Sequence, residues 1–74
     1  MIRVRFTVKY PVDLIDMVAL FAIILSRFSL AKVELEDSTH FWVAVDHIHF
    51  TPEDEKFLDS LVDEEWVQHW NTFQ

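Results

Sequence analysis

The sequence predicts an α+β domain in which two helices pack on one face of a three-stranded sheet. Three observations predict it: an alternating apolar stretch near the N-terminus, a helix-length apolar segment after it, and two more strand-like stretches followed by a strong helix start. The 74 residues form one domain, 1–74, at the low end of the sizes that fold independently. With no glycine and no cysteine, the chain excludes Gly-rich phosphate loops, disulfides and thiolate metal clusters.

The first strand is predicted over residues 2–10. Apolar residues alternate there with basic residues and one threonine, which is the pattern of a half-buried strand. Pro11 ends the strand because proline has no N–H for the ladder. A helix is predicted over residues 12–28. On a helical wheel its core face comprises Leu14, Val18, Phe21, Ala22, Leu25 and Phe28.

The predicted polar side of this helix is also partly apolar. Charged residues mark that side, yet three large apolar side chains lie among them: Leu20, Ile23 and Ile24. A helix that is apolar all round is normally buried all round, so a further surface should cover these three residues. We therefore expect a homodimer with Leu20, Ile23 and Ile24 at its interface.

Two further strands are predicted to form an antiparallel hairpin. Residues 31–36 alternate between apolar and charged types, residues 37–40 have turn chemistry, and residues 41–50 are rich in β-branched and aromatic side chains. Thr51-Pro52-Glu53-Asp54 then indicates a helix start, since threonine caps, proline suits the first helical position and acids favour the positive end of the helix dipole. This helix is predicted to run from Pro52 to about Trp70.

The order strand, helix, strand, strand, helix resembles a ferredoxin-like fold that lacks its last strand, with sheet order 2-3-1. The resemblance is one of topology. In such a sheet the first strand is an open edge, and an open edge favours pairing with a second chain. The expected homodimer therefore has two candidate seams, the hydrophobic first helix and the first-strand edge.

Charge divides unevenly along the chain, whose formal net charge is −7. Residues 1–32 hold five basic and two acidic side chains, whereas residues 33–74 hold one lysine and eleven carboxylates. Glu55, Asp59 and Asp63 recur at every fourth position, and like charges at that spacing destabilise a helix by about 0.2–0.5 kcal/mol per pair. A basic partner explains such a pattern, and so does the need to keep a small apolar domain in solution.

Two tryptophans follow these carboxylates. Trp66 and Trp70 lie one turn apart on the predicted helix, among polar residues that include Glu64 and Glu65. Tryptophan within a polar rim is typical of binding hot spots, although both indoles can equally cover one end of the core. The candidate partner-binding residues are Glu55, Asp59, Asp63, Glu64, Glu65, Trp66 and Trp70.

Signals for catalysis and metal binding are weak in comparison. His47 and His49 lie two residues apart on a predicted strand, next to Asp46, so both imidazoles can share one face. A metal site needs a third and usually a fourth ligand, and no spacing identifies one, so metal binding by Asp46, His47 and His49 stays open. We assign no catalytic residue, no metal and no cofactor.

The sequence therefore predicts a small acidic protein-binding module that is not an enzyme. The first hypothesis is an inhibitor that mimics nucleic acid and occupies a basic surface of a target protein, a class typical of phages and mobile elements. The alternative is a homo-oligomeric interaction module. We expect a cytoplasmic protein. Its acidic face should repel nucleic acid. We expect no membrane binding, because the apolar run 17–25 is shorter than the about 20 residues that span a bilayer.

Overall fold

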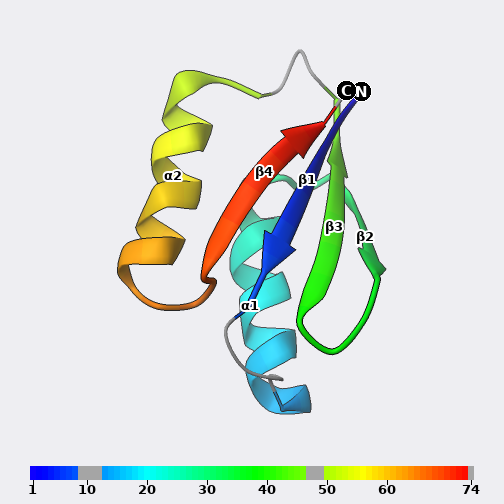
Figure 1. Ribbon diagram of the computed structural model, residues 1–74. Coiled ribbons are helices and arrows are strands. Elements are labelled where there is room, and N and C mark those ends of the chain that lie inside the picture. The colour runs from blue at the N-terminus through cyan, green and yellow to red at the C-terminus, as the bar shows by residue number, and fades with distance from the viewer. Residues whose placement is uncertain (9–12, 47–49, 74) are drawn as a thin grey trace.

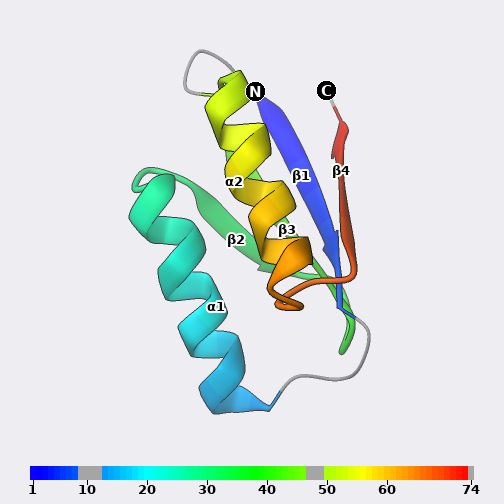
Figure 2. The same ribbon diagram turned by 90° about the vertical axis from the view of Figure 1, so that its left-hand side faces the viewer.

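The structure is a computed structural model that describes residues 1–8, 13–46 and 50–73. Its elements are, in chain order, β1 (Ile2–Thr7), α1 (Leu14–Arg27), β2 (Lys32–Leu35), β3 (His40–Val45), α2 (Pro52–Asp63) and β4 (His69–Phe73). The strands form one antiparallel sheet in the order β2-β3-β1-β4, and both helices lie on one of its faces (Figure 1, Figure 2). The α+β class is confirmed. The prediction of three strands is wrong, because there is a fourth.

The predicted last helix ends early, and its final residues form β4. α2 ends at Asp63, and Glu65 has a left-handed backbone with a φ of 64°. The Trp66 amide donates a hydrogen bond to the Leu61 carbonyl at 2.9 Å, and the Glu65 amide donates one to the Val62 carbonyl at 3.0 Å. This pair of bonds is a Schellman motif, which usually has glycine at its left-handed position. A chain without glycine therefore carries no conventional signal for this helix end.

β4 covers the edge of β1 that the prediction left open. β1 lies in the interior of the sheet, because it pairs with β3 on one side and with β4 on the other. The prediction that the first strand offers an exposed edge is therefore wrong, and the open edges belong to β2 and β4. Over the described residues, this element order and the sheet order β2-β3-β1-β4 correspond to the topology of the split βαβ, or ferredoxin-like, motif.

The core lies between the sheet and the two helices. Phe6 and Phe41 stack at its centre with ring centroids 4.8 Å apart, and Phe21 of α1 meets Phe41 edge-on at 4.9 Å. Full burial of each such side chain contributes about 1.5–3 kcal/mol to folding. The buried apolar residues are Val4, Phe6, Val8, Leu20, Ile24, Phe28, Phe41, Val43, Val45, Leu58, Leu61 and Val67.

The core face of α1 is rotated from the one predicted: Phe28 is buried and Phe21 packs against the core as expected, but Ala22 is exposed. Leu20 and Ile24, which were expected outside the core, are 1% and 0% exposed, whereas Val18 is 60% exposed. The prediction took the charged residues as markers of the solvent side. Asp13 is instead the N-cap of α1, and Arg27 reaches across to α2. Capping and an ion pair fix these two positions, so they do not mark the solvent side. Among the described residues, neither helix combines the length and hydropathy that crossing a membrane requires.

Asp54 joins the start of α2 to the end of α1. Its Oδ2 accepts hydrogen bonds from the Thr51 amide at 2.8 Å and from the Thr51 hydroxyl at 3.0 Å, and its Oδ1 accepts one from Arg27 Nε at 2.6 Å. Burial raises the pKa of Asp54, but the hydrogen bonds from Thr51 and Arg27 outweigh this effect and lower the pKa overall. The predicted helix start at Pro52, with Thr51 as its N-cap, is confirmed.

Candidate functional site

Three carboxylates of α2, beginning in its first turn, form an exposed ridge along one side of the helix. Glu55, Asp59 and Asp63 are exposed and stand four residues apart, which is about 6 Å of rise along the helix axis. Glu64 and Glu65, which follow the end of the helix in sequence, are also exposed. The last turn of α2 contains no basic residue. We call Glu55, Asp59, Asp63, Glu64 and Glu65 the acidic ridge.

No cation of residues 1–8, 13–46 or 50–73 forms an ion pair with the acidic ridge. The ion pairs within these residues are Arg3 to Glu34, Arg5 to Glu36, Arg27 to Asp54, and His40 to Glu36 and to Asp37. Arg3 and Arg5 are thus engaged on the sheet face without helices, and Arg27 is engaged between the two helices. The ridge keeps its negative charge available to a partner.

The two candidate tryptophans occupy different elements. Trp70 lies half-buried on β4, and its Nε1 donates a hydrogen bond to Asp59 Oδ1 at 3.1 Å, which ties β4 to the middle of the acidic ridge. Trp66 lies in the connection after α2 and packs, half-buried, against the core. The prediction that both indoles stand one turn apart on a helix is wrong, because the helix ends at Asp63.

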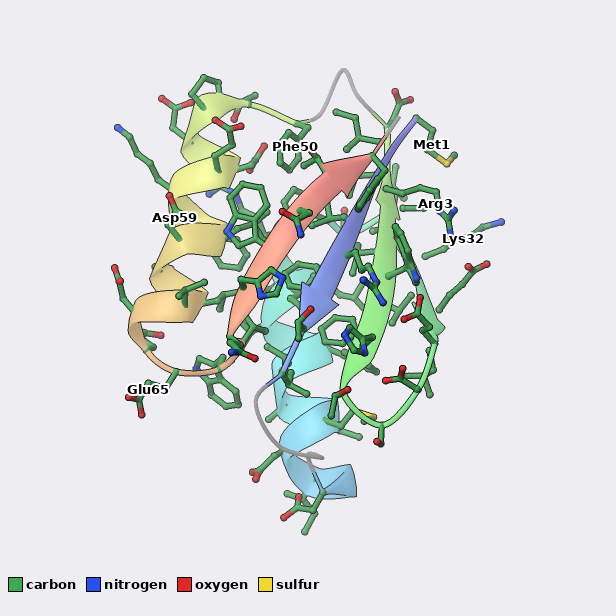
Figure 3. The ribbon with its side chains drawn as sticks, in the orientation of Figure 1. Met1, Arg3, Lys32, Phe50, Asp59 and Glu65 are labelled. Carbon is green, nitrogen blue, oxygen red and sulfur yellow. The ribbon has the colours of Figure 1, made fainter. Side chains whose placement is uncertain are left out.

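The seven candidate partner-binding residues therefore follow one path through α2, the connection and β4. Figure 3 shows Asp59 and Glu65 on the side of the molecule where β4 forms the edge of the sheet. The carboxylates lie on the surface, while Trp66 and Trp70 are half-buried beneath or beside them. The sequence placed the carboxylates on one helix, and the fold sets an open strand edge beside them.

The three predicted interface residues of α1 lie on its core side. Leu20 and Ile24 are buried, and Ile23 is half-buried against the core. A second copy cannot contact Leu20 or Ile24 while the domain is folded, so the prediction that these side chains await an outside cover is wrong. Among the α1 side chains that the structure describes, the large apolar ones that are exposed are Ile15, at 82%, and Val18, at 60%.

Sequence reasoning missed a cluster on the sheet face that bears no helix. The ring of Trp42 has the Arg3 guanidinium 4.3 Å from its centroid and the Phe73 ring at 5.3 Å. Its Nε1 donates a hydrogen bond to Glu36 at 3.0 Å, and Arg5 pairs with the same carboxylate. The hydrogen bonds from Arg5 and then Trp42 lower the pKa of Glu36. The alternation in β1 and β3 was a signal for Arg3 and Trp42, whereas Phe73 required knowledge of β4.

One group of side chains among the described residues brings three possible cation ligands together. A ligand atom from each of Glu36, Asp37 and His40 lies within 4.8 Å of the other two. Hydrogen bonds from the Thr39 amide and from His40 lower the pKa of Asp37 to about 2. Because the protein's own donors already engage Glu36 and Asp37, this geometry is accounted for by the closure of the β2–β3 hairpin.

The sequence left open whether Asp46, His47 and His49 bind a metal ion. His47 and His49 lie outside the described residues. Asp46 lines a hollow of about 660 Å³ that also borders the Arg27–Asp54 pair.

No protein-family model, curated protein or solved structure matches this chain.

Proposed function

We propose that this domain is a protein-binding module without enzymatic activity, an inhibitor that occupies a basic, nucleic-acid-binding surface of a target protein. The acidic ridge carries the proposal, since its five exposed carboxylates have no ion-pair partner among the described residues. A domain of net charge −7 with such a ridge attracts basic surfaces, speeds association with them and repels nucleic acid.

The ridge supports mimicry because carboxylates and phosphates use the same partners. Arginine binds either group through paired N–H···O bonds, and lysine binds either as a point charge. Carboxylates spaced about 6 Å apart along α2 can engage several cations of a nucleic-acid site at once. The hydrogen bond from Trp70 holds Asp59 in place before binding, which reduces the ordering entropy that a partner must overcome.

The test compares two charge reversals of equal size. One variant carries Asp59→Lys and Asp63→Lys on the acidic ridge, and its control carries Asp16→Lys and Glu34→Lys elsewhere on the surface. Host proteins captured by the immobilised wild-type domain are purified and titrated with each variant. We expect the ridge variant to bind roughly tenfold or more weakly and the control to bind within about twofold of wild type.

Two further results belong to the same test. Wild-type affinity should fall as salt is raised, and nucleic acid should compete with the domain for the captured protein. Equal losses in both variants, or affinity that is independent of salt, contradict the proposal.

Self-association is a second candidate, favoured by one observation. Ile15 and Val18 are large apolar residues that α1 exposes to solvent, three positions apart on one helical face. We propose this face as the dimer seam in place of the one first predicted. Sedimentation velocity should show a concentration-dependent dimer in wild type and a monomer in Val18→Glu. A wild-type chain that stays monomeric at every concentration rejects the dimer.

A further inference from the structure

We infer that the outer edge of β4 receives an extended segment of the partner as a fifth strand, with basic side chains over α2 alternating with apolar ones on the far face. The inference rests on the proposed function and names the part of the partner that the acidic ridge recognises. It begins from the two open edges of the sheet, β2 and β4.

These two edges differ in how well they are protected against pairing. Natural edge strands are kept from pairing by short length, charged side chains, proline or bulges. β2 has four residues, of which Lys32 and Glu34 are charged. β4 has five residues, HWNTF, with no lysine, arginine, acid or proline among them. β4 is therefore the edge whose backbone N–H and C=O groups are suited to an added strand.

The helix beside β4 supplies the charge that selects the added strand. α2 lies next to β4 in Figure 1, and the hydrogen bond from Trp70 to Asp59 joins the two elements. Side chains of a strand alternate between the two faces of its sheet. On the helix face, every second side chain of a fifth strand would lie beside the acidic ridge, where lysine or arginine is favoured.

The opposite row of side chains would meet a different surface. Phe73 lies on the face without helices, is 46% exposed and contacts the Trp42 ring. An apolar side chain at the neighbouring position of the added strand would extend this aromatic pair. The edge thus selects a segment in which basic and apolar residues alternate, with backbone hydrogen bonds giving affinity and the two rows giving specificity.

A second copy of this chain is the less favourable occupant. Antiparallel pairing of β4 with its own copy places the two α2 helices on the same face, next to each other across the seam. The Glu55, Asp59 and Asp63 carboxylates of both copies would then approach one another, and like charges across an interface oppose association. A basic segment removes that repulsion by neutralising the ridge.

The experiment uses the full chain and three synthetic heptapeptides. The first alternates lysine with valine, the second replaces every lysine with glutamate, and the third is the lysine peptide methylated on alternate backbone nitrogens. Backbone amide hydrogen exchange and chemical shifts of the domain are followed by NMR. We expect the lysine peptide to slow exchange in β4 and not in β2, the glutamate peptide not to bind, and N-methylation to weaken binding roughly tenfold.

The other outcomes separate this inference from the proposed function. If the N-methylated peptide binds as well as its parent while the glutamate peptide does not, the partner docks on the charge of α2 alone, and strand addition is wrong. If the glutamate peptide binds as well as the lysine peptide, the acidic ridge has no role and the proposed function fails. Protection at β2, protection of β4 that rises with protein concentration alone, or no binding by the lysine peptide at about 1 mM each overturns strand addition.

Discussion

Arg27 of α1 donates a hydrogen bond from Nε to Oδ1 of Asp54 on α2 across 2.6 Å. The Asp54 side chain is 7% exposed and that of Arg27 is 41% exposed, so one end of the pair lies in the protein and the other in solvent. The same carboxylate accepts both hydrogen bonds from Thr51 at the start of α2. One buried side chain therefore caps a helix and links the two helices that cover the sheet.

Replacing Asp54 should destabilise the domain well beyond the worth of an exposed ion pair. Asp54→Ala removes the acceptor of the Thr51 amide and of Arg27, and we expect it to lower the free energy of unfolding by about 2 kcal/mol. Glu53→Ala, at an exposed position of the same helical turn, should change it by less than about 0.5 kcal/mol. Urea unfolding measures both values. Similar losses in the two variants contradict the assignment.

The same carboxylate should make stability depend on acid pH. The pKa of Asp54 is lowered in the folded state from its ordinary value of 3.8, so the ionised group contributes stability above that value. This contribution is lost as the pH falls through the folded-state pKa. Urea unfolding between about pH 5 and pH 2 should therefore show a steeper decline in wild type than in Asp54→Asn. Equal slopes in the two proteins contradict this role of Asp54.

The sequence predicts those elements whose apolar residues recur at a regular spacing or whose first residues carry a helix-capping signal. The alternation in residues 2–8 reports a half-buried strand, and Thr51-Pro52 marks the start of α2 through cap and dihedral chemistry. The face of α1 could not be read in the same way. Its apolar residues surround the helix. The charged residues at its two ends are there because Asp13 is the N-cap and Arg27 bonds Asp54 of α2.

The sequence predicts the carboxylates of the candidate site but not the strand edge beside them. The four-residue spacing of Glu55, Asp59 and Asp63 requires only that α2 be helical, which its start and pattern indicate. The edge beside them depends on where the helix ends, and Glu65 ends it without a glycine. The one usable signal lay in residues 69–73, where β-branched and aromatic residues replace the good helix formers.

The left-handed residue after α2 should be a site where glycine stabilises. Glu65 has a φ of 64°, where a Cβ atom costs about 1–2 kcal/mol. We expect Glu65→Gly to raise the free energy of unfolding by about 1 kcal/mol, because glycine adopts this conformation without a steric penalty. Glu64→Gly removes an equal charge at a residue with φ of −85°, and it should lower stability by about 0.5–1 kcal/mol. Thermal or urea unfolding of both variants distinguishes backbone strain from a charge effect.

Truncations on the two sides of α1 should differ sharply. Ile24→Ala leaves a cavity at a residue that is 0% exposed, and we expect a loss of about 2–5 kcal/mol. Val18→Ala shortens a side chain that is 60% exposed, and the change should stay within about 0.5 kcal/mol. Denaturant unfolding at low protein concentration measures the monomer in each case. The reverse ranking would restore the helix face that the sequence first predicted.

The bond between Trp70 and Asp59 should couple the fold to the acidic ridge. Trp70→Phe keeps an aromatic ring on β4 but removes the indole N–H, and we expect it to lower the free energy of unfolding by about 1 kcal/mol. A double-mutant cycle with Asp59→Ala should return a coupling of about 0.5–1 kcal/mol, while a cycle that pairs Trp70→Phe with Asp63→Ala should return about zero. Equal coupling in both cycles would mean that the tryptophan responds to the charge of α2 as a whole. A coupling confined to Asp59 means that one hydrogen bond holds the acidic ridge against the open edge of β4. The variants that lose this hydrogen bond should then also bind a partner more weakly.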